Sequence, residues 1–184
     1  MNPTSLNSKI ASYSNLLNFF TVSEFEILGF VLSTSLRESG TYIFNSTESL
    51  PQYIFKRETR ARDVTLKKGD FVEVCPKYSK IQNFVQIKKR ITGTCDSGVK
   101  PFLKIVGAVP GDFVEINNVS GIIVNNKILK DTVALSSKVE HFNYKGYVPH
   151  RRYILYTQNP EGYDSRYFGF VDLDEIIFKL TPVF

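Results

Sequence analysis

The sequence predicts a mainly β protein with an N-terminal helix, and three observations support this fold class. The chain of 184 residues contains 15 Phe and 10 Tyr, residue types that favour strands. After residue 40, short apolar runs alternate with turn-forming Asn, Gly and Pro. The first forty residues carry instead one long, mostly apolar stretch. We therefore divide the chain into an N-terminal helical segment, residues 1–40, and a β-rich domain, residues 41–184.

The apolar stretch of the N-terminal segment, residues 16–36, is nearly long enough to cross a bilayer. However, Glu24 and Glu26 lie at its middle. A charged residue at the centre of a membrane helix costs about 2.5–3.5 kcal/mol, so two of them nearly cancel the apolar gain. Upstream, only Lys9 supplies a positive flank. We expect a degenerate or interfacial membrane anchor.

The β-rich domain contains a series of strand-like runs joined by short turns. Asn125-Asn126 suits a tight hairpin turn, because Asn tolerates positive φ angles. Residues 130–147 are polar and irregular, and we expect an insertion loop there. Strands joined by short turns imply an all-β or mainly-β body. The predicted strands are residues 71–75, 83–91, 102–109, 113–117, 121–126, 127–129, 152–157, 166–171 and 175–180.

The charge of the chain is moderately basic, with a formal net charge of +5 at pH 7. The basic residues are scattered in short groups rather than gathered in one dense tract. No recognition helix, zinc finger or aromatic RNA-binding motif accompanies them, so we expect no nucleic-acid partner.

The chain contains two cysteines, Cys75 and Cys95, twenty positions apart. In an oxidising compartment they can form a disulfide, worth about 3 kcal/mol for a loop of this size. In the cytosol they would remain reduced thiols. The only histidines, His141 and His150, show no metal-ligand spacing relative to the cysteines, and we expect no metal or other cofactor.

Lys104 stands out because it interrupts an apolar, β-branched run that reads as a buried strand. Lysine is rarely buried unless it is paired or has lost its proton. Lowering its pKa by about 3 units costs about 4 kcal/mol and yields a usable general base. The alternative is a lysine whose stem covers apolar surface while its ammonium reaches water.

Ser49 is a candidate nucleophile for such a base. The following Leu50-Pro51 holds the chain extended and non-helical, so the hydroxyl would be exposed on a stiff segment. Thr47 would project to the same face and help the Ser49 amide stabilise an oxyanion. The alternative is a Ser/Thr-rich linker between the N-terminal helix and the first strand.

A third candidate element is the turn at Asp164, Ser165 and Arg166, which leads into the predicted strand 166–171. An Asp in such a turn usually hydrogen-bonds to the local backbone. It can instead hold an ammonium group in place, as the orienting member of a catalytic triad does. The turn by itself leaves both readings open.

Taken together, these segments resemble the signal peptidase I family of serine/lysine peptidases, and more closely the TraF-type peptidases of conjugative transfer systems. The family's nucleophile segment, Ser-x-Pro, matches Ser49 to Pro51. Its base strand, Leu-Lys followed by Ala-x-Pro-Gly-Asp, matches Leu103-Lys104 and residues 108–112. Its C-terminal signature matches Asn159-Pro160 and residues 164–169.

The resemblance extends to the cysteines, because a Cys-Pro after the first strand matches Cys75-Pro76 and a second cysteine before the lysine strand matches Cys95. Two positions depart from the pattern. Tyr53 stands where the family has glycine, and Ile105 stands where it usually has arginine. Neither change removes a catalytic side chain.

The resemblance implies a signal-peptidase or LexA-like antiparallel β-sheet body and a specific chemistry. Ser49 is the implied nucleophile, Lys104 the base and Asp164 the residue that orients it. The oxyanion and substrate residues are Thr47 and Pro51, with Ser165 and Arg166 in a supporting turn and Cys75–Cys95 as a structural disulfide. The implied substrate is a pilin-like precursor of a conjugative, type IV secretion system, cut at the periplasmic face of the inner membrane.

Two other classes of function remain open on the sequence. One is a catalytically weak or inactive adaptor that keeps the peptidase fold and binds a component of the secretion system. The other is a LexA-like self-cleaving regulator of the cytosol. That group shares the Ser/Lys pair but lacks the Asp-Ser-Arg-Tyr-Phe-Gly signature, and no DNA-binding helix-turn-helix precedes the β region here.

Overall fold

The computed structural model describes residues 40–45, 49–51, 54–82, 93–133 and 139–183. The chain divides into two compact units, Met1–Thr41 and Tyr42–Phe184, and nearly all of the described residues belong to the second. Within the described ranges, no helix has the length and apolar character needed to cross a membrane. The predicted anchor, residues 16–36, lies outside the described residues.

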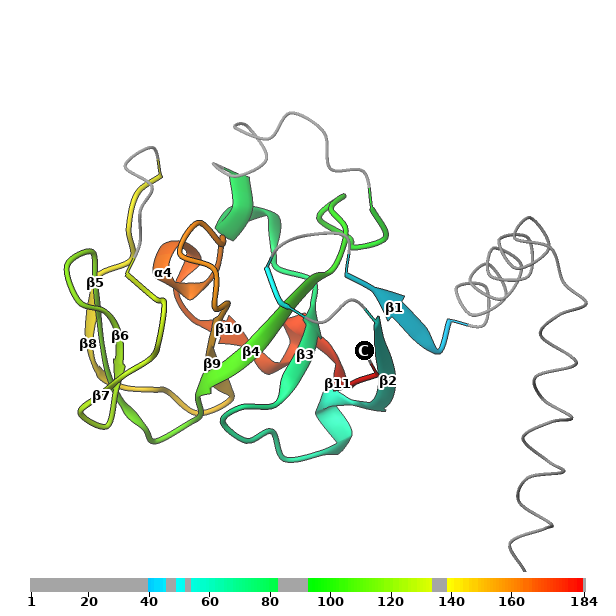
Figure 1. Ribbon diagram of the computed structural model, residues 1–184, viewed down its shortest axis with the longest axis horizontal. Coiled ribbons are helices and arrows are strands. Elements are labelled where there is room, and N and C mark those ends of the chain that lie inside the picture. Colours follow the sequence, from blue (N-terminus) through cyan, green and yellow to red (C-terminus); the bar gives the residue numbers. More distant parts are fainter. Residues whose placement is uncertain (1–39, 46–48, 52–53, 83–92, 134–138, 184) are drawn as a thin grey trace, which may run out of the picture. The chain divides into compact units, whose positions relative to one another are not determined.

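A seven-stranded antiparallel sheet forms the body of the domain (Figure 1). Its strands follow the order β1-β2-β11-β3-β4-β9-β10, so β4 lies inside the sheet between β3 and β9. The strands are β1 (Tyr42–Phe44), β2 (Ile54–Arg60), β3 (Phe71–Val74), β4 (Phe102–Ala108), β9 (Arg152–Tyr156), β10 (Val171–Asp172) and β11 (Ile176–Pro182).

A second sheet of four antiparallel strands packs beyond the end of β4, in the order β7-β6-β5-β8. These strands are β5 (Phe113–Asn117), β6 (Gly121–Val124), β7 (Lys127–Ile128) and β8 (Tyr144–Tyr147). The helices with both ends among the described residues are short: α4 (Ser165–Phe168) and two 3-10 turns, η1 (Ala61–Asp63) and η2 (Leu173–Glu175). Residues 78–82 are also helical. The mainly β, antiparallel fold class is confirmed.

Most of the predicted strands that fall on described residues are confirmed, including β3, β4, β9 and β11. The Asn125-Asn126 hairpin is present, with φ angles of 48° and 66° that the turn requires. Predicted strand 83–91 lies outside the described residues. Strands β1 and β2, which flank the Ser49 segment, were not predicted.

The predicted strand 166–171 is wrong. The chain forms α4 there and reaches strand geometry only at β10, because the Asp164 side chain accepts a hydrogen bond from the Arg166 amide and caps a helical turn. Gly169, with a φ of 72°, ends that turn. The predicted loop 130–147 is also wrong at its C-terminal end, where β8 pairs with β5.

Buried residues cover both faces of the large sheet, which explains why β4 is apolar almost throughout. One face carries a cluster that includes Val72, Val106 and Leu155. The opposite face carries a cluster of Leu50, Phe55, Leu103, Ile105 and Leu180. Since side chains alternate along a strand, Lys104 points to the first face, between Phe102 and Val106.

A disulfide joins Cys75, at the end of β3, to Cys95, in the loop before β4, with 5.4 Å between the two Cα atoms. Around it lies a small apolar cluster of Ile81, Cys95 and Val99, against which Phe102 packs. The bridge therefore fixes the loop that leads into the lysine strand.

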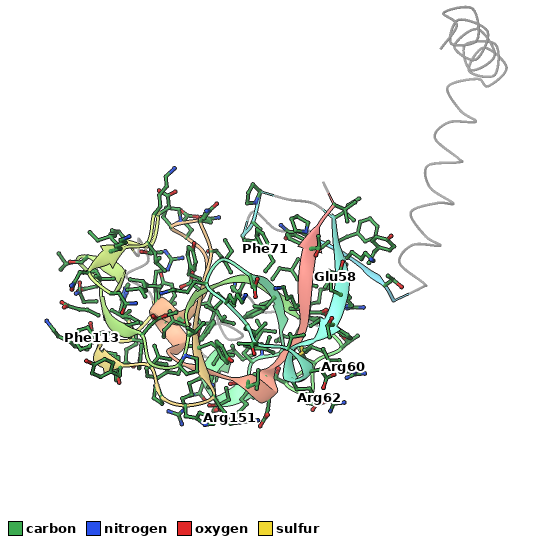
Figure 2. The ribbon with its side chains drawn as sticks, turned by 90° about the horizontal axis from the view of Figure 1, so that it is seen from below. Glu58, Arg60, Arg62, Phe71, Phe113 and Arg151 are labelled. Carbon is green, nitrogen blue, oxygen red and sulfur yellow. A yellow bond between two sulfur atoms is a disulfide. The ribbon has the colours of Figure 1, made fainter. Side chains whose placement is uncertain are left out.

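The charged residues on the outside of the domain are dispersed. Arg60 and Arg62, at the end of β2 and in η1, project outward, and Arg151 does so elsewhere on the domain (Figure 2). Arg151 pairs with Asp174 at 2.8 Å, with both side chains more than half exposed. Such exposed pairs contribute little to stability.

Candidate active site

Lys104 is buried in the interior of the large sheet, with only 4% of the residue exposed. It lies in register with Val72 of β3, and its neighbours along β4, Leu103 and Ile105, are buried on the other face. Lys104 is therefore not a lysine that snorkels to water along apolar surface.

Burial lowers the pKa of Lys104 from 10.5 to about 8, because the charged ammonium loses its hydration. Two charged groups nearby act in opposite directions. The Asp164 carboxylate favours the protonated lysine and raises the pKa, whereas the Arg166 guanidinium disfavours it and lowers the pKa. The Lys104 Nζ also lies over the ring of Phe102, 5.3 Å from its centre.

Asp164 and Arg166 form a fully buried ion pair, with Arg166 Nη2 2.7 Å from Asp164 Oδ2. Arg166 Nε donates a second hydrogen bond, to Asp164 Oδ1, at 2.8 Å. The other described bonds to the carboxylate come from the Arg166 and Thr157 amides and the Thr157 hydroxyl. Asp164 therefore acts on Lys104 through its charge, while these hydrogen bonds hold it in place.

Arg166 also organises the loop between β9 and α4. Its guanidinium donates to the backbone carbonyls of Asn159, Pro160 and Gly162 at 2.8, 3.0 and 2.9 Å. The loop closes so tightly that a Cβ at Gly162 would lie 2.0 Å from Thr157 Oγ1. Glycine is therefore the residue that fits at position 162.

Ser165 ties the same helix to the sheet. Its buried Oγ accepts a hydrogen bond from the Leu155 amide of β9 at 2.9 Å. In Figure 1, α4 lies beside β9, the strand that pairs with the lysine strand. The predicted supporting turn of Ser165 and Arg166 thus links α4, β9 and the surroundings of Lys104.

Ser49 lies in the connection between β1 and β2 and is partly buried. The Asn45 side chain closes this connection by donating to the Leu50 carbonyl at 2.8 Å. Leu50 is buried in the same cluster as Leu103 and Ile105, the two neighbours of Lys104. The fold thus brings the Ser49 segment to the lysine strand, although β1 is the edge strand of the sheet and β2 lies next to it.

The local conformation at Ser49 differs from the sequence prediction. Residues 49–51 form a turn rather than an extended segment, because the chain reverses direction between the antiparallel β1 and β2. Pro51 is exposed in this turn. Thr47, the predicted oxyanion residue, and Tyr53 lie outside the described residues.

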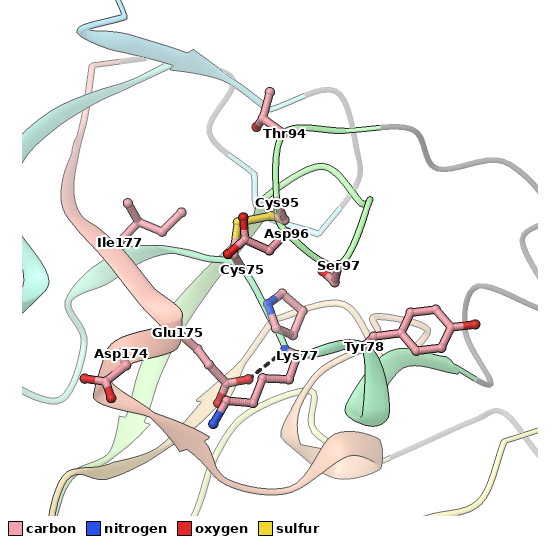
Figure 3. Close-up of a pocket in the computed structure, with 11 residues that line it drawn as sticks. Cys75, Lys77, Tyr78, Thr94, Cys95, Asp96, Ser97, Asp174, Glu175 and Ile177 are labelled. Atoms are coloured by element: carbon pink, nitrogen blue, oxygen red, sulfur yellow. Dashed lines mark hydrogen bonds between the residues drawn. A yellow bond between two sulfur atoms is a disulfide. The ribbon is translucent and has the colours of Figure 1, made fainter.

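A separate open pocket of ≈ 520 Å³ lies at the disulfide (Figure 3). Its lining includes both cysteines, Lys77, Tyr78, Asp96 and Glu175. Glu175 accepts a hydrogen bond from the Lys77 amide at 2.8 Å, which holds the chain after Cys75 against η2. Lys104, Asp164 and Ser49 do not line this pocket.

Two residues near Lys104 were missed by the sequence reasoning, Phe102 and Thr157. The place of Phe102 beside Lys104 could have been predicted, since residues two apart on a strand share a face. The place of Thr157 could not have been predicted, because its contact with Asp164 depends on how the loop between β9 and α4 closes. Among the described residues, no group of three or more His, Cys, Asp or Glu side chains is placed to hold a metal ion.

The family to which the chain belongs follows from comparison with known proteins. The sequence profile of the family described as "Signal peptidase, peptidase S26" matches residues 15–184. The chain is therefore a member of the signal peptidase S26 family.

Curated relatives give a finer comparison. The chain is 31% identical over 155 residues to the conjugal transfer protein TraF of Agrobacterium tumefaciens, covering 82% of this chain and 86% of that one. It is 30% identical over 164 residues to the protein of the same name from Agrobacterium fabrum, covering 86% and 92%. The predicted resemblance to TraF-type members of the family is confirmed.

Among solved structures, a signal peptidase I from Enterococcus faecalis aligns with 64% of this chain and 98% of its own. The sequence identity is 18% and the TM-score is 0.39.

Replacing Lys104 by Met should stabilise the fold in a pH-dependent way. Between pH 8 and 10.5 the folded protein binds fewer protons than the unfolded chain, so the stability of the wild-type protein rises with pH across that range. Below pH 8 the wild-type protein bears the full cost of burying a charged Lys104. We expect Lys104→Met to gain on the order of 3 kcal/mol at pH 7 and about 1 kcal/mol less at pH 9. Urea unfolding at both pH values measures this; Lys130→Met, at an exposed site, is the control. A gain that does not change with pH would contradict a depressed lysine pKa.

Replacing Arg166 by Ala should destabilise the domain strongly. The change leaves the buried Asp164 carboxylate without its cationic partner and removes one donor from each of three loop carbonyls. We expect a loss of about 3–5 kcal/mol in the free energy of unfolding. Arg151→Ala, which breaks the exposed pair with Asp174, should lose less than about 1 kcal/mol. Equal losses in the two variants would refute the structural role of Arg166.

Proposed function

We propose that this chain is a serine endopeptidase in which neutral Lys104 activates Ser49. The observation that carries the proposal is Lys104 itself, a fully buried lysine with a pKa of about 8 in a member of a peptidase family. The unfavourable burial of this lysine in an otherwise apolar strand is readily explained by a need for its neutral amine. Leu50, next to Ser49, packs against Leu103 and Ile105, which brings the Ser49 segment into contact with the strand that carries Lys104.

The proposed reaction begins when the neutral Lys104 amine takes the proton of the Ser49 hydroxyl as its oxygen attacks a substrate peptide carbonyl. The Ser49 amide and the Thr47 hydroxyl stabilise the resulting oxyanion. Lys104 then returns the proton to the leaving amine, and an acyl-enzyme remains. Water, or a substrate amine if the enzyme performs acyl transfer, resolves that ester.

In this scheme Asp164 and Arg166 adjust the lysine rather than contact the substrate. The carboxylate stabilises the ammonium that forms when Lys104 accepts the Ser49 proton, and the guanidinium keeps the resting pKa from rising. The two charges therefore hold the base near the pH at which it must both accept and release a proton.

We place this activity in a conjugative system, with a pilin-like precursor as the substrate, because the curated relatives are conjugal transfer proteins. The site of action would be the periplasmic face of the inner membrane. The disulfide supports an oxidising compartment, where such bonds persist. The apolar N-terminal stretch of residues 16–36 would hold the enzyme at the membrane.

Substitution of either member of the proposed pair should abolish precursor cleavage without unfolding the protein. We expect Ser49→Ala and Lys104→Met each to reduce cleavage by at least about 1000-fold, because nucleophile and base act as one unit. Mass spectrometry of the purified cognate precursor before and after incubation measures this. Ser97→Ala, at a serine of the disulfide loop, is the matched control and should cleave normally.

Normal cleavage by Ser49→Ala or Lys104→Met would refute the Ser/Lys assignment. A folded wild-type protein that neither cleaves the precursor nor reacts with an acylating serine inhibitor would support the adaptor instead.

The cleavage rate should rise with pH through about 8, since only the neutral lysine accepts the serine proton. About one tenth of the molecules carry neutral Lys104 at pH 7 and about nine tenths at pH 9. The rate constant kcat/KM, measured between pH 6 and 10, reports this ionisation in the free enzyme. A midpoint near 10, as for an exposed lysine, would contradict the proposed base.

A further inference from the structure

Phe102, at the start of β4, lies directly beside Lys104. The two residues are two positions apart on one strand and therefore project to the same face of the sheet. The Lys104 Nζ lies 5.3 Å from the centre of the Phe102 ring, within the range of a cation–π contact. Nothing in the proposed reaction yet uses this ring.

The ring is held in place by two apolar clusters. On one side it packs against the main core, with Val72, Val74 and Val106. On the other it packs against the cluster around the Cys75–Cys95 disulfide. Phe102 also lies in register with Val74 of β3, and the disulfide begins at the next residue, Cys75. A ring fixed by a sheet pairing and a covalent bridge has little freedom to move away from the lysine.

We propose that Phe102 is a positioning residue, which holds the Lys104 ammonium over its ring face and so sets the affinity of that amine for a proton. The inference rests on the proposed function, in which Lys104 is the base. The disulfide cluster takes part indirectly, because it fixes the ring that holds the ammonium.

The physical effect of the ring opposes that of burial. The negative face of an aromatic ring attracts an ammonium but not a neutral amine, so the ring favours protonation. Among the described residues, the charged groups that act on Lys104 are Asp164, which also favours protonation, and Arg166, which opposes it. Beside Lys104 on β3 lies the apolar Val72. Tyr163, in contact with the disulfide cluster, is neutral at these pH values because burial raises its pKa to about 12.

The sharpest test keeps the shape of the ring and removes its charge distribution. Replacing Phe102 by a trifluorinated phenylalanine retains the packing but strips electron density from the ring face. We expect the titration midpoint of Lys104 to fall by about 0.5–1 pH unit. The Phe102→Leu variant should also lower the Lys104 midpoint, whereas Phe102→Tyr, which keeps an electron-rich ring, should leave it at the wild-type value. The midpoint is read from the NMR signal of the Lys104 side-chain amine, assigned by its absence in Lys104→Met.

The matched control places the same fluorinated residue at Phe113, on β5 of the small sheet, and should leave the Lys104 midpoint unchanged. An unchanged or raised midpoint in folded protein fluorinated at position 102 would overturn the proposal and leave Phe102 a packing residue. The NMR readout needs no substrate. A wild-type protein without peptidase activity would therefore defeat the proposed function while the role of Phe102 is still decided.

Discussion

The buried pair of Asp164 and Arg166 is the interaction on which the arrangement around Lys104 depends. The Asp164 carboxylate caps α4 by accepting from the Arg166 amide, and it holds the end of β9 by accepting from the Thr157 amide. The guanidinium donors that remain close the loop of residues 157–162. A buried ion pair by itself is weak evidence for stability, since desolvation opposes the attraction. Here almost every donor and acceptor of the pair has a partner, and this makes the burial tolerable. The same two charges then act on the lysine in opposite directions.

Burying Lys104 costs folding free energy, which the rest of the domain offsets. Strands β3 and β9 flank it, and the clusters on both sheet faces exclude water from β4. The disulfide cluster adds rigidity where the strand begins, at Phe102. A conformationally fixed, dehydrated amine is unfavourable for stability and favourable for accepting a proton near neutral pH. This opposition is typical of functional sites and is easier to explain by chemistry than by packing.

The sequence predicted the secondary structure better than it predicted the contacts between side chains. The apolar run around Lys104, the Asn125-Asn126 turn and most strands depend on local patterns, and these were predicted correctly. The α4 turn was not, because the strand-like composition of residues 166–171 outweighed the local capping signal of Asp164. Strand β8 alternates between partly buried and exposed residues and carries little apolar signal, so pairing with β5 alone identifies it. Beyond Asp164, the guanidinium of Arg166 donates to backbone carbonyls, which no residue pattern encodes.

The most direct test of the account is the distance between Ser49 Oγ and Lys104 Nζ in a crystal structure of the protein grown near pH 9. At that pH the lysine is mostly neutral and free to accept a hydrogen bond from the serine hydroxyl. We predict a separation of about 2.6–3.2 Å, the range of a catalytic hydrogen bond. A separation beyond the reach of one bridging water, with Lys104 still buried, would contradict the proposed role of the lysine as the base for Ser49.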